Sequence, residues 1–448
     1  MNRSSVVPQF LLTGVSLLVF AANTAAQSAS SSDYAITHAN IYTLAGTPIE
    51  DGSVVIHDGK IAAVGQGVTI PAGAQVIDAK GLRVYPGLFD SVTQMGLSEI
   101  SAVSATVDTT ESGQLNPDVV AATAVLPSSM HIPVTRASGI TEVLAVPASG
   151  GFDSRGEKNL IGGQASAIHM TGWTVEDMLL KRSAAMVVDW PDVETRSFDF
   201  STLSIKEKPF ADAKKEYDKK VGQLADYIEQ ARHYAAALQN PADVSFSRDV
   251  KLEALAPVIR GEMPVLVFAD HTRQIREAVE FCNKQKLKMV LAGGEEAWKV
   301  KDLLRSKSVP VILRPTLGAP PEEDDPYDRQ LTQPAELTAA GVKIAFASFD
   351  NSFARRLGQG AANAVSHGLS PEEALKAVTL YPALFLGLDS QLGTVETGKI
   401  ANLIVTNGDP LDVTAEVRYL FIKGQLTSTD NKQKALYDKY TNRPKAAH

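Results

Sequence analysis

The stretch "VYPGLFDSVTQMGL", residues 84–97, places Asp90, Val92 and Gln94 at alternate positions after an apolar run. Histidines at positions 92 and 94 would give this stretch the ligands of a metal-dependent hydrolase, in which a bound metal lowers the pKa of water to about 7. Neither histidine is present. The stretch therefore keeps the frame of a metal-binding strand but lacks its imidazole ligands.

Two further apolar runs end in groups that could take part in chemistry. Asp270 and His271 follow "MPVLVFA", and Asp350 follows "VKIAFASF". Imidazoles and carboxylates can bind a divalent metal together, so a compensating site built from these three residues is an alternative, although they show no ligand spacing. We predict Asp350 as the catalytic candidate, with Gln94, Asp270, His271 and Arg314 as substrate-binding candidates.

Apolar runs and amphipathic segments alternate from residue 140 onward, for example "MPVLVFAD", "TRQIREAVEFCNKQ" and "LKMVLAGG". Continuous apolar runs flanked by helices are typical of buried parallel strands. Repeated units of this kind predict a parallel barrel or a doubly wound sheet. The Gly- and Ser-rich residues 146–167 are expected to form a loop over the barrel mouth, and residues 198–240 a charged, solvated helical excursion.

The two ends of the chain have β character instead. Short β-branched runs fill residues 33–85, where Asp58-Gly59 predicts a tight hairpin turn. Residues 392–428 return to the same texture and are expected to pair with the first segment. A helix is predicted to start at Ser370, with Pro371 in its first turn and Glu373 completing a capping box.

Four motifs together resemble the amidohydrolase superfamily, in its imidazolonepropionase-like branch. They are "VYPGLFD", "GVKIAFAS", "SPEEALKAVTLYPALFLGL" and "LGTVETGKIANLIVTNGDPL", in this order. The resemblance implies a distorted TIM (β/α)8 barrel, residues 86–391, inserted into a small β-sandwich formed by residues 33–85 and 392–428. Residues 429–448 would form a polar tail. Members of this family hydrolyse C–N bonds with one or two divalent metals at the barrel mouth.

The resemblance also implies where metal ligands belong. Besides positions 92 and 94, histidines are expected at position 268, which is Phe268, and within 292–294, which reads Ala-Gly-Gly. The last ligand, an aspartate, falls on Phe349, one residue before Asp350, and Asn402 stands where the family commonly has Asp. His131 and His169 are alternative contributors from loops. We therefore predict no bound cofactor, whereas the family uses zinc or another divalent metal.

Composition and the N-terminus limit the location and the partners. Residues 1–26 read as a signal peptide cleaved after Ala26, which predicts a periplasmic protein with no membrane span in the mature chain. The net charge of -8 argues against nucleic-acid binding, because phosphate backbones are met by clustered Lys and Arg. Cys282 is the only cysteine and is expected to be buried.

Two functions remain open at this point. The first is an exported hydrolase of non-peptide C–N bonds, such as cyclic amides or amides, with an altered or missing metal site. The alternative is a non-catalytic protein that binds a small molecule or pairs with an active relative. A homo-oligomer is compatible with both.

Overall fold

The computed structural model describes residues 33–147, 159–199, 204–239 and 247–443. The predicted signal peptide, residues 1–26, lies outside the described residues, and so do residues 148–158 of the predicted mouth loop and the last five residues of the predicted tail.

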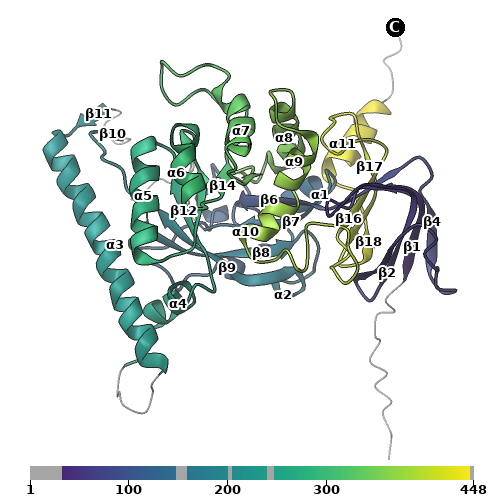
Figure 1. Ribbon diagram of the computed structural model, residues 1–448, viewed down its shortest axis with the longest axis horizontal. Helices are drawn as coiled ribbons and strands as arrows, with labels where there is room; N and C mark the ends of the chain where they lie inside the picture. The colour runs from purple at the N-terminus through teal and green to yellow at the C-terminus, as the bar shows by residue number, and fades with distance from the viewer. Residues whose placement is uncertain (1–32, 148–158, 200–203, 240–246, 444–448) are drawn as a thin grey trace, which may run out of the picture. The chain divides into compact units, whose positions relative to one another are not determined.

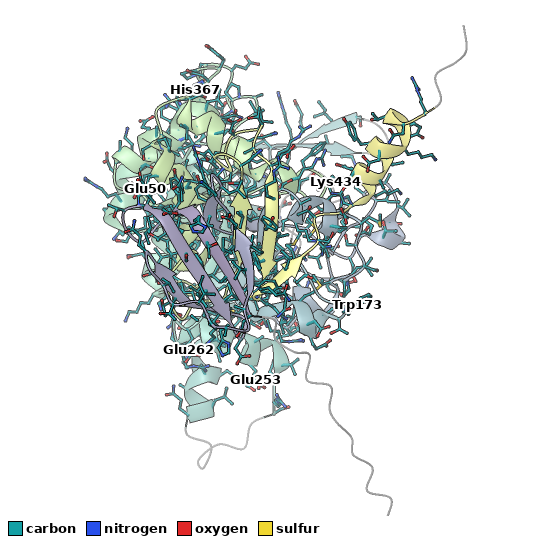
Figure 2. The ribbon with its side chains drawn as sticks, turned by 90° about the vertical axis from the view of Figure 1, so that its right-hand side faces the viewer. Glu50, Trp173, Glu253, Glu262, His367 and Lys434 are labelled. Carbon is teal, nitrogen blue, oxygen red and sulfur yellow. The ribbon has the colours of Figure 1, made fainter. Side chains whose placement is uncertain are left out.

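One sheet is formed by both ends of the described chain (Figure 1). Its strands are β1 (Tyr34–Ile41), β2 (Ile49–His57), β3 (Lys60–Gly65), β4 (Gln75–Asp78), β5 (Arg83–Pro86), β16 (Leu403–Thr406), β17 (Val417–Ile422) and β18 (Gln425–Thr427). Strand β5 pairs antiparallel with β16, which joins the two ends of the chain. Figure 2 faces this sheet, with Glu50 on β2 and Lys434 on the C-terminal helix labelled.

The predicted hairpin is present in this sheet. Strands β2 and β3 pair antiparallel across Asp58 and Gly59, whose φ angles are +51° and +78°. Both central residues of such a turn need positive φ, which Gly adopts freely and Asp tolerates.

The second sheet is a nearly closed barrel. Its strands are β6 (Leu88–Thr93), β7 (Ile140–Ala145), β8 (Ile161–His169), β9 (Leu179–Asp189), β12 (Val265–Ala269), β13 (Met289–Gly293), β14 (Val311–Leu313) and β15 (Ile344–Phe346). Several bonds join the first and last strands and the residues that follow them, including the Phe349 amide, which donates to the Val92 carbonyl at 2.9 Å, and the Ser91 hydroxyl, which donates to the Phe346 carbonyl at 3.0 Å. The predicted fold, a barrel with a β domain from both chain ends, is confirmed.

Strand β8 departs from the predicted pattern because it runs antiparallel to both neighbours, β7 and β9. Its residues "IGGQASAIH" belong partly to the Gly- and Ser-rich segment, residues 146–167, that was predicted to be a loop, and that prediction is wrong for residues 161–167. All nine residues are buried. The small side chains allow close packing rather than loop formation: a Cβ at Gly163 would lie 2.8 Å from the Val119 carbonyl oxygen.

Eleven α-helices lie within the described residues. They are α1 (His131–Arg136), α2 (Val175–Met178), α3 (Phe210–Gln239), α4 (Val250–Ile259), α5 (Thr272–Gln285), α6 (Lys301–Ser306), α7 (Arg329–Ala339), α8 (Leu357–Val365), α9 (Pro371–Ala377), α10 (Leu380–Phe385) and α11 (Lys432–Thr441). Helix α9 begins as predicted, with the Ser370 side chain accepting from the Glu373 amide at 3.2 Å. The predicted capping box is not formed, because the Glu373 carboxylate accepts from the Tyr381 hydroxyl at 2.8 Å.

Helix α3 corrects the prediction of a solvated excursion. It is 30 residues long and lies beside α4 and α5 (Figure 1). Leu224 and Ile228 are buried on its inner face, and the Arg232 guanidinium donates to the carbonyl of Gln285, the last residue of α5, at 2.9 Å. The helix therefore packs on the barrel layer with one face, and Arg232 takes part in that contact. A short hairpin of β10 (Arg196–Asp199) and β11 (Ser204–Glu207) precedes it.

Two other expectations concern single features. Cys282 is buried on α5, as predicted, and burial raises the pKa of its thiol to about 12. Among the described helices, none is both long enough and apolar enough to cross a membrane.

Candidate ligand-binding site at the barrel mouth

The carboxyl ends of the parallel barrel strands carry polar side chains around a small cavity. The cavity has a volume of about 110 Å³ and is lined by Asp189, Trp190, Asp192, Phe268, Ala269, Asp270, His271, Gln274 and Arg314. Three of the five predicted site residues, Asp270, His271 and Arg314, therefore lie together. They follow β12 and β14, and they meet because parallel strands end at the same rim of a barrel.

The centre of this mouth is an ion pair. The Arg314 guanidinium bonds to both carboxylate oxygens of Asp270, with Nε–Oδ1 at 3.1 Å and Nη2–Oδ2 at 2.9 Å. Glu295 lies 3.6 Å from the same guanidinium. The guanidinium carbon also lies 4.7 Å from the centre of the Phe349 ring. Arg314 is thus held by two carboxylates and an aromatic face, an arrangement that suits the planar guanidinium.

A glycine makes this pairing possible. Gly293 ends β13 with φ of +97°, and a Cβ there would lie 2.2 Å from Asp270 Oδ1. A side chain at this position would push the carboxylate out of its place. The "AGG" triplet therefore marks a close approach between β12 and β13.

Burial changes the pKa of Glu295, the second carboxylate beside Arg314. The pKa of Glu295 is raised, first because of burial and then because of the charge of Asp270, while Arg314 acts in the opposite direction. Arg314 therefore offsets only part of the effect that burial and Asp270 have on the pKa of Glu295.

Hydrocarbon fills the barrel beneath the ion pair. Val92, Phe268 and Ala292 are buried in one apolar cluster, against which Phe349 packs. The rings of Phe268 and Phe349 meet edge to face with centroids 6.1 Å apart. Phe349 has a φ of +52°, unusual for a bulky residue, and its amide bonds to the barrel seam.

Asp90 and Asp350 lie at that seam, between β6 and β15. The Ser348 amide and hydroxyl both donate to the Asp90 carboxylate, the amide at 2.9 Å. Asp90 is fully buried, and burial raises its pKa to about 7. The Asp350 carboxylate accepts from the amides of Ser352 and Phe353, the latter at 2.8 Å, so it caps its own turn.

Gln94 ends the same seam, and neither Gln94 nor Asp350 lines the mouth cavity. The structure therefore separates the five predicted site residues into a group of three at the cavity and a pair at the seam. Their roles stay predictions.

One group of side chains at the rim could hold a metal ion. Within the described ranges, His271, Glu296 and Glu322 are the one set of three or more His, Cys, Asp or Glu residues whose ligand atoms all lie within 4.8 Å of one another. Glu296 is buried; Lys299 donates to its Oε1 at 2.7 Å, and the Thr272 amide donates to its Oε2 at 2.6 Å. This set shares only His271 with the compensating site considered from the sequence.

His169 lies elsewhere. It ends β8 at the opposite end of the barrel, where the Asn402 side-chain amide donates to its Nδ1 at 3.0 Å and also to Glu142. Burial raises the pKa of Glu142 to about 8 and lowers the pKa of His169 to about 3. Asn402 also accepts from the Lys423 amide at 2.6 Å. This network connects the barrel to the terminal sheet.

Sequence reasoning missed Asp189, Trp190, Gly293 and Glu295 at the mouth. Asp189 and Trp190 end the apolar run "AAMVV", so the strand-end argument that selected Asp270 could have found them. Little in the sequence indicated that Gly293 and Glu295 belong to the site. Gly293 matters because it leaves room for Asp270, and Glu295 because it lies beside Arg314.

Comparison with known proteins supports the relationship inferred from the motifs. The model of the Amidohydrolase family matches residues 321–429. The chain is 25% identical over 411 residues to Amidohydrolase tasK of Hapsidospora irregularis, covering 83% of this chain and 39% of that protein, so it spans about two fifths of that relative's length. It is 48% identical over 61 residues to an imidazolonepropionase of Serratia proteamaculans (strain 568), 14% of each chain.

A solved structure shows the same fold. An amidohydrolase from Thermotoga maritima MSB8 superposes with a TM-score of 0.74 at 24% identity, covering 88% of this chain and 99% of that one. At this identity the likeness concerns the fold alone.

Proposed function

This chain belongs to the amidohydrolase superfamily, a lineage of hydrolases, and we propose that it is an exported member whose barrel mouth binds a small molecule without the usual metal centre. The binding residues would be Asp270, His271 and Arg314. Export rests on the signal-like residues 1–26 alone.

The apolar filling of the barrel carries this proposal. A zinc site needs three or four N, O or S ligands at about 2.0–2.3 Å. Positions 92, 268 and 292, where the family would have histidines, offer hydrocarbon packed in one buried cluster. The Asp90 carboxylate is occupied by Ser348, and the Asp350 carboxylate by its own turn. The residues present do not fit the family metal at that place.

Arg314 supplies a permanent positive charge above this apolar layer. A guanidinium stays protonated at all physiological pH values, so the Asp270 and Glu295 carboxylates do not need a metal to balance them. Such a mouth presents charged hydrogen-bond donors and acceptors close together. It suits an amide or cyclic amide, whose carbonyl accepts from Arg314 or His271 and whose N–H donates to a carboxylate.

A second candidate is a hydrolase with a relocated metal at the rim. His271, Glu296 and Glu322 would hold the ion, and Lys299 and the Thr272 amide would orient Glu296. A metal there could activate water next to a ligand in the mouth. Lys299 opposes this candidate, because its charge already compensates Glu296.

Elemental mass spectrometry separates the two candidates. The mature protein would be purified without a His tag from cells supplied with zinc and manganese, beside Asp350→Ala and Glu322→Gln variants. We expect no stoichiometric metal in any of the three proteins. Metal that disappears only in Glu322→Gln would establish the rim site, and metal that disappears in Asp350→Ala would overturn the proposal.

Ligand binding needs its own test. The mature protein would be heated with a panel of cyclic amides and amides, and we expect at least one to raise the unfolding temperature. That rise should be absent in Arg314→Ala and unchanged in the matched variant Arg305→Ala, which lies at the other end of the barrel. No response to any compound in the panel would count against an amide ligand.

A further inference from the structure

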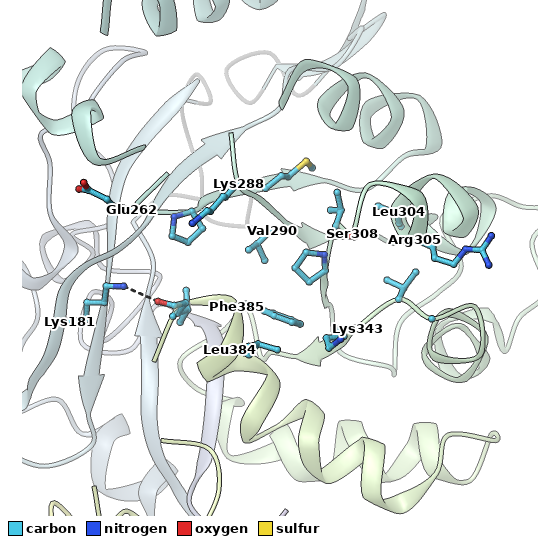
Figure 3. A pocket seen from close by; sticks show the side chains of 18 residues that line it. Lys181, Glu262, Lys288, Val290, Leu304, Arg305, Ser308, Lys343, Leu384 and Phe385 are labelled. Carbon is cyan, nitrogen blue, oxygen red and sulfur yellow. Dashed lines mark hydrogen bonds between the residues drawn. The ribbon is translucent and has the colours of Figure 1, made fainter. Parts of the chain in front are cut away.

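A second cavity lies at the end of the barrel opposite to the mouth (Figure 3). Its volume is about 510 Å³, within the range of roughly 300–1,000 Å³ that small-molecule sites occupy. Four of its lining residues immediately precede β12, β13, β14 and β15, namely Pro264, Lys288, Pro310 and Lys343. Residues of α10 and those around the end of α6 complete the wall. No residue lines both this cavity and the mouth cavity.

The walls of this cavity are strongly basic. They carry Lys181, Lys288, Arg305 and Lys343, and one acidic residue, Glu262. The Glu262 carboxylate is already held by both ends of the Arg260 guanidinium, at 2.7 and 2.8 Å. In the part of the chain that the structure describes, Lys288, Arg305 and Lys343 form no ion pair with a carboxylate. The positive charge of the cavity is therefore not neutralised by the protein.

Apolar residues lie between these cations. Figure 3 shows Val290 and Phe385 in the middle of the cavity, with the labelled basic side chains spread around them. Both apolar residues are buried. Lys181 is anchored at one side by a bond from its ammonium to the Leu386 carbonyl at 2.9 Å, and burial lowers its pKa. The cavity thus combines an apolar floor with several cationic donors.

The cavity is positively charged, whereas the chain as a whole has a net charge of -8. Like charges gathered in a hollow repel one another, and low-dielectric walls concentrate their field toward an incoming anion. We infer that this cavity binds a small organic molecule with two or more negative charges, such as a di- or tricarboxylate or a phosphate ester. Its charged groups would meet Lys288, Lys343 and Lys181, and its carbon skeleton would lie against Val290 and Phe385.

Titration calorimetry on the full mature chain tests this inference. Citrate and inorganic pyrophosphate serve as separate probes at low ionic strength, so that carboxylate and phosphate ligands are distinguished. The variant is Lys288→Gln with Lys343→Gln. The control is Lys284→Gln with Lys307→Gln, which removes the same charge from exposed lysines outside the cavity.

We expect saturable binding of one equivalent of at least one probe, weakened about tenfold or more by the cavity variant and less than about twofold by the control. Equal weakening in both variants would reduce the effect to general charge attraction and overturn the site. Unchanged binding in the cavity variant would place the anion elsewhere, and absent binding to the unmodified protein would also reject the inference.

Discussion

The charged side chains at the two ends of the barrel differ in whether they are paired. At the mouth, Arg314 is bonded to Asp270 and stacked on Phe349, so the charges are paired above a packed apolar layer. At the other end, Lys288, Arg305 and Lys343 surround a cavity without carboxylate partners. Paired charges stabilise the fold that holds them, whereas unpaired charges in a cavity are available to a ligand. The comparison indicates which charged residues can be removed without loss of stability.

The largest effect is expected when Arg314 is replaced by alanine. Asp270 and Glu295 would lose their cation in a partly buried site, and the free energy of unfolding should fall by about 3 kcal/mol. Urea denaturation measures this, with Arg305→Ala as a matched control that should change stability by less than about 0.5 kcal/mol. The double variant Arg314→Ala, Asp270→Ala should recover part of the loss. Equal losses in the two arginine variants would break the contrast between the two ends.

Gly293→Ala should have the next largest effect. The new Cβ would meet Asp270 Oδ1 and would also adopt a positive φ, so we expect a loss of about 2–3 kcal/mol. Gly67→Ala isolates the backbone contribution, because Gly67 has a φ of +64° and nothing within 4 Å of its Cβ position. That control should cost about 1 kcal/mol. If urea denaturation gave similar losses of unfolding free energy for both variants, the side chains at the mouth would be able to move and accommodate an added methyl group.

The pH dependence of stability should come partly from the network at the far end. Burial raises the pKa of Glu142 to about 8, so the folded protein holds its proton more tightly than the unfolded chain. Its contribution to stability is therefore fully present below pH of about 4.5 and is lost as the pH rises through about 8. Asp90, with a pKa raised to about 7, acts in the same direction.

Unfolding temperatures measured from pH 5 to pH 9 test this for Glu142→Gln. The unmodified protein should lose stability toward pH 9, and the variant should lose less, since glutamine cannot ionise. Glu50→Gln, at an exposed position of β2, serves as the control and should follow the unmodified protein. A variant whose pH profile matched that of the control would show that Glu142 is not protonated in the folded state.

The smallest effect is expected for Lys181→Met. Methionine retains an apolar stem but loses the single bond from the ammonium to the Leu386 carbonyl, so stability should fall by no more than about 1 kcal/mol. The same urea experiment measures it. A loss comparable with that of Arg314→Ala would mean that this end of the barrel also depends on its charges for stability.

The sequence alone predicted the architecture and part of the site. Apolar runs and turn residues are patterns of a few neighbouring positions. They were enough to predict the strand that ends before Asp270, the Asp58-Gly59 turn and the start of α9 at Ser370. Strand β8 could not be predicted, because its two glycines and Ser166 are typical of a loop. They form a strand here because their small size fits the space between β7 and β9. The prediction for helix α3 was wrong because its many charges dominate the sequence pattern, whereas its buried face becomes evident only where it packs on α4 and α5.

The sequence by itself determined that strands and helices would alternate between two terminal β segments, and which side chains would end the strands, because periodicity is a local property. The choice of a barrel over a doubly wound sheet came from the family resemblance. Only the tertiary structure decided which of those side chains meet. Arg314 and Asp270 are 44 residues apart and become partners because β12 and β14 end at the same rim with Gly293 between them. Asp350 follows the neighbouring strand, yet its carboxylate turns into its own loop, because nearby backbone amides satisfy it first.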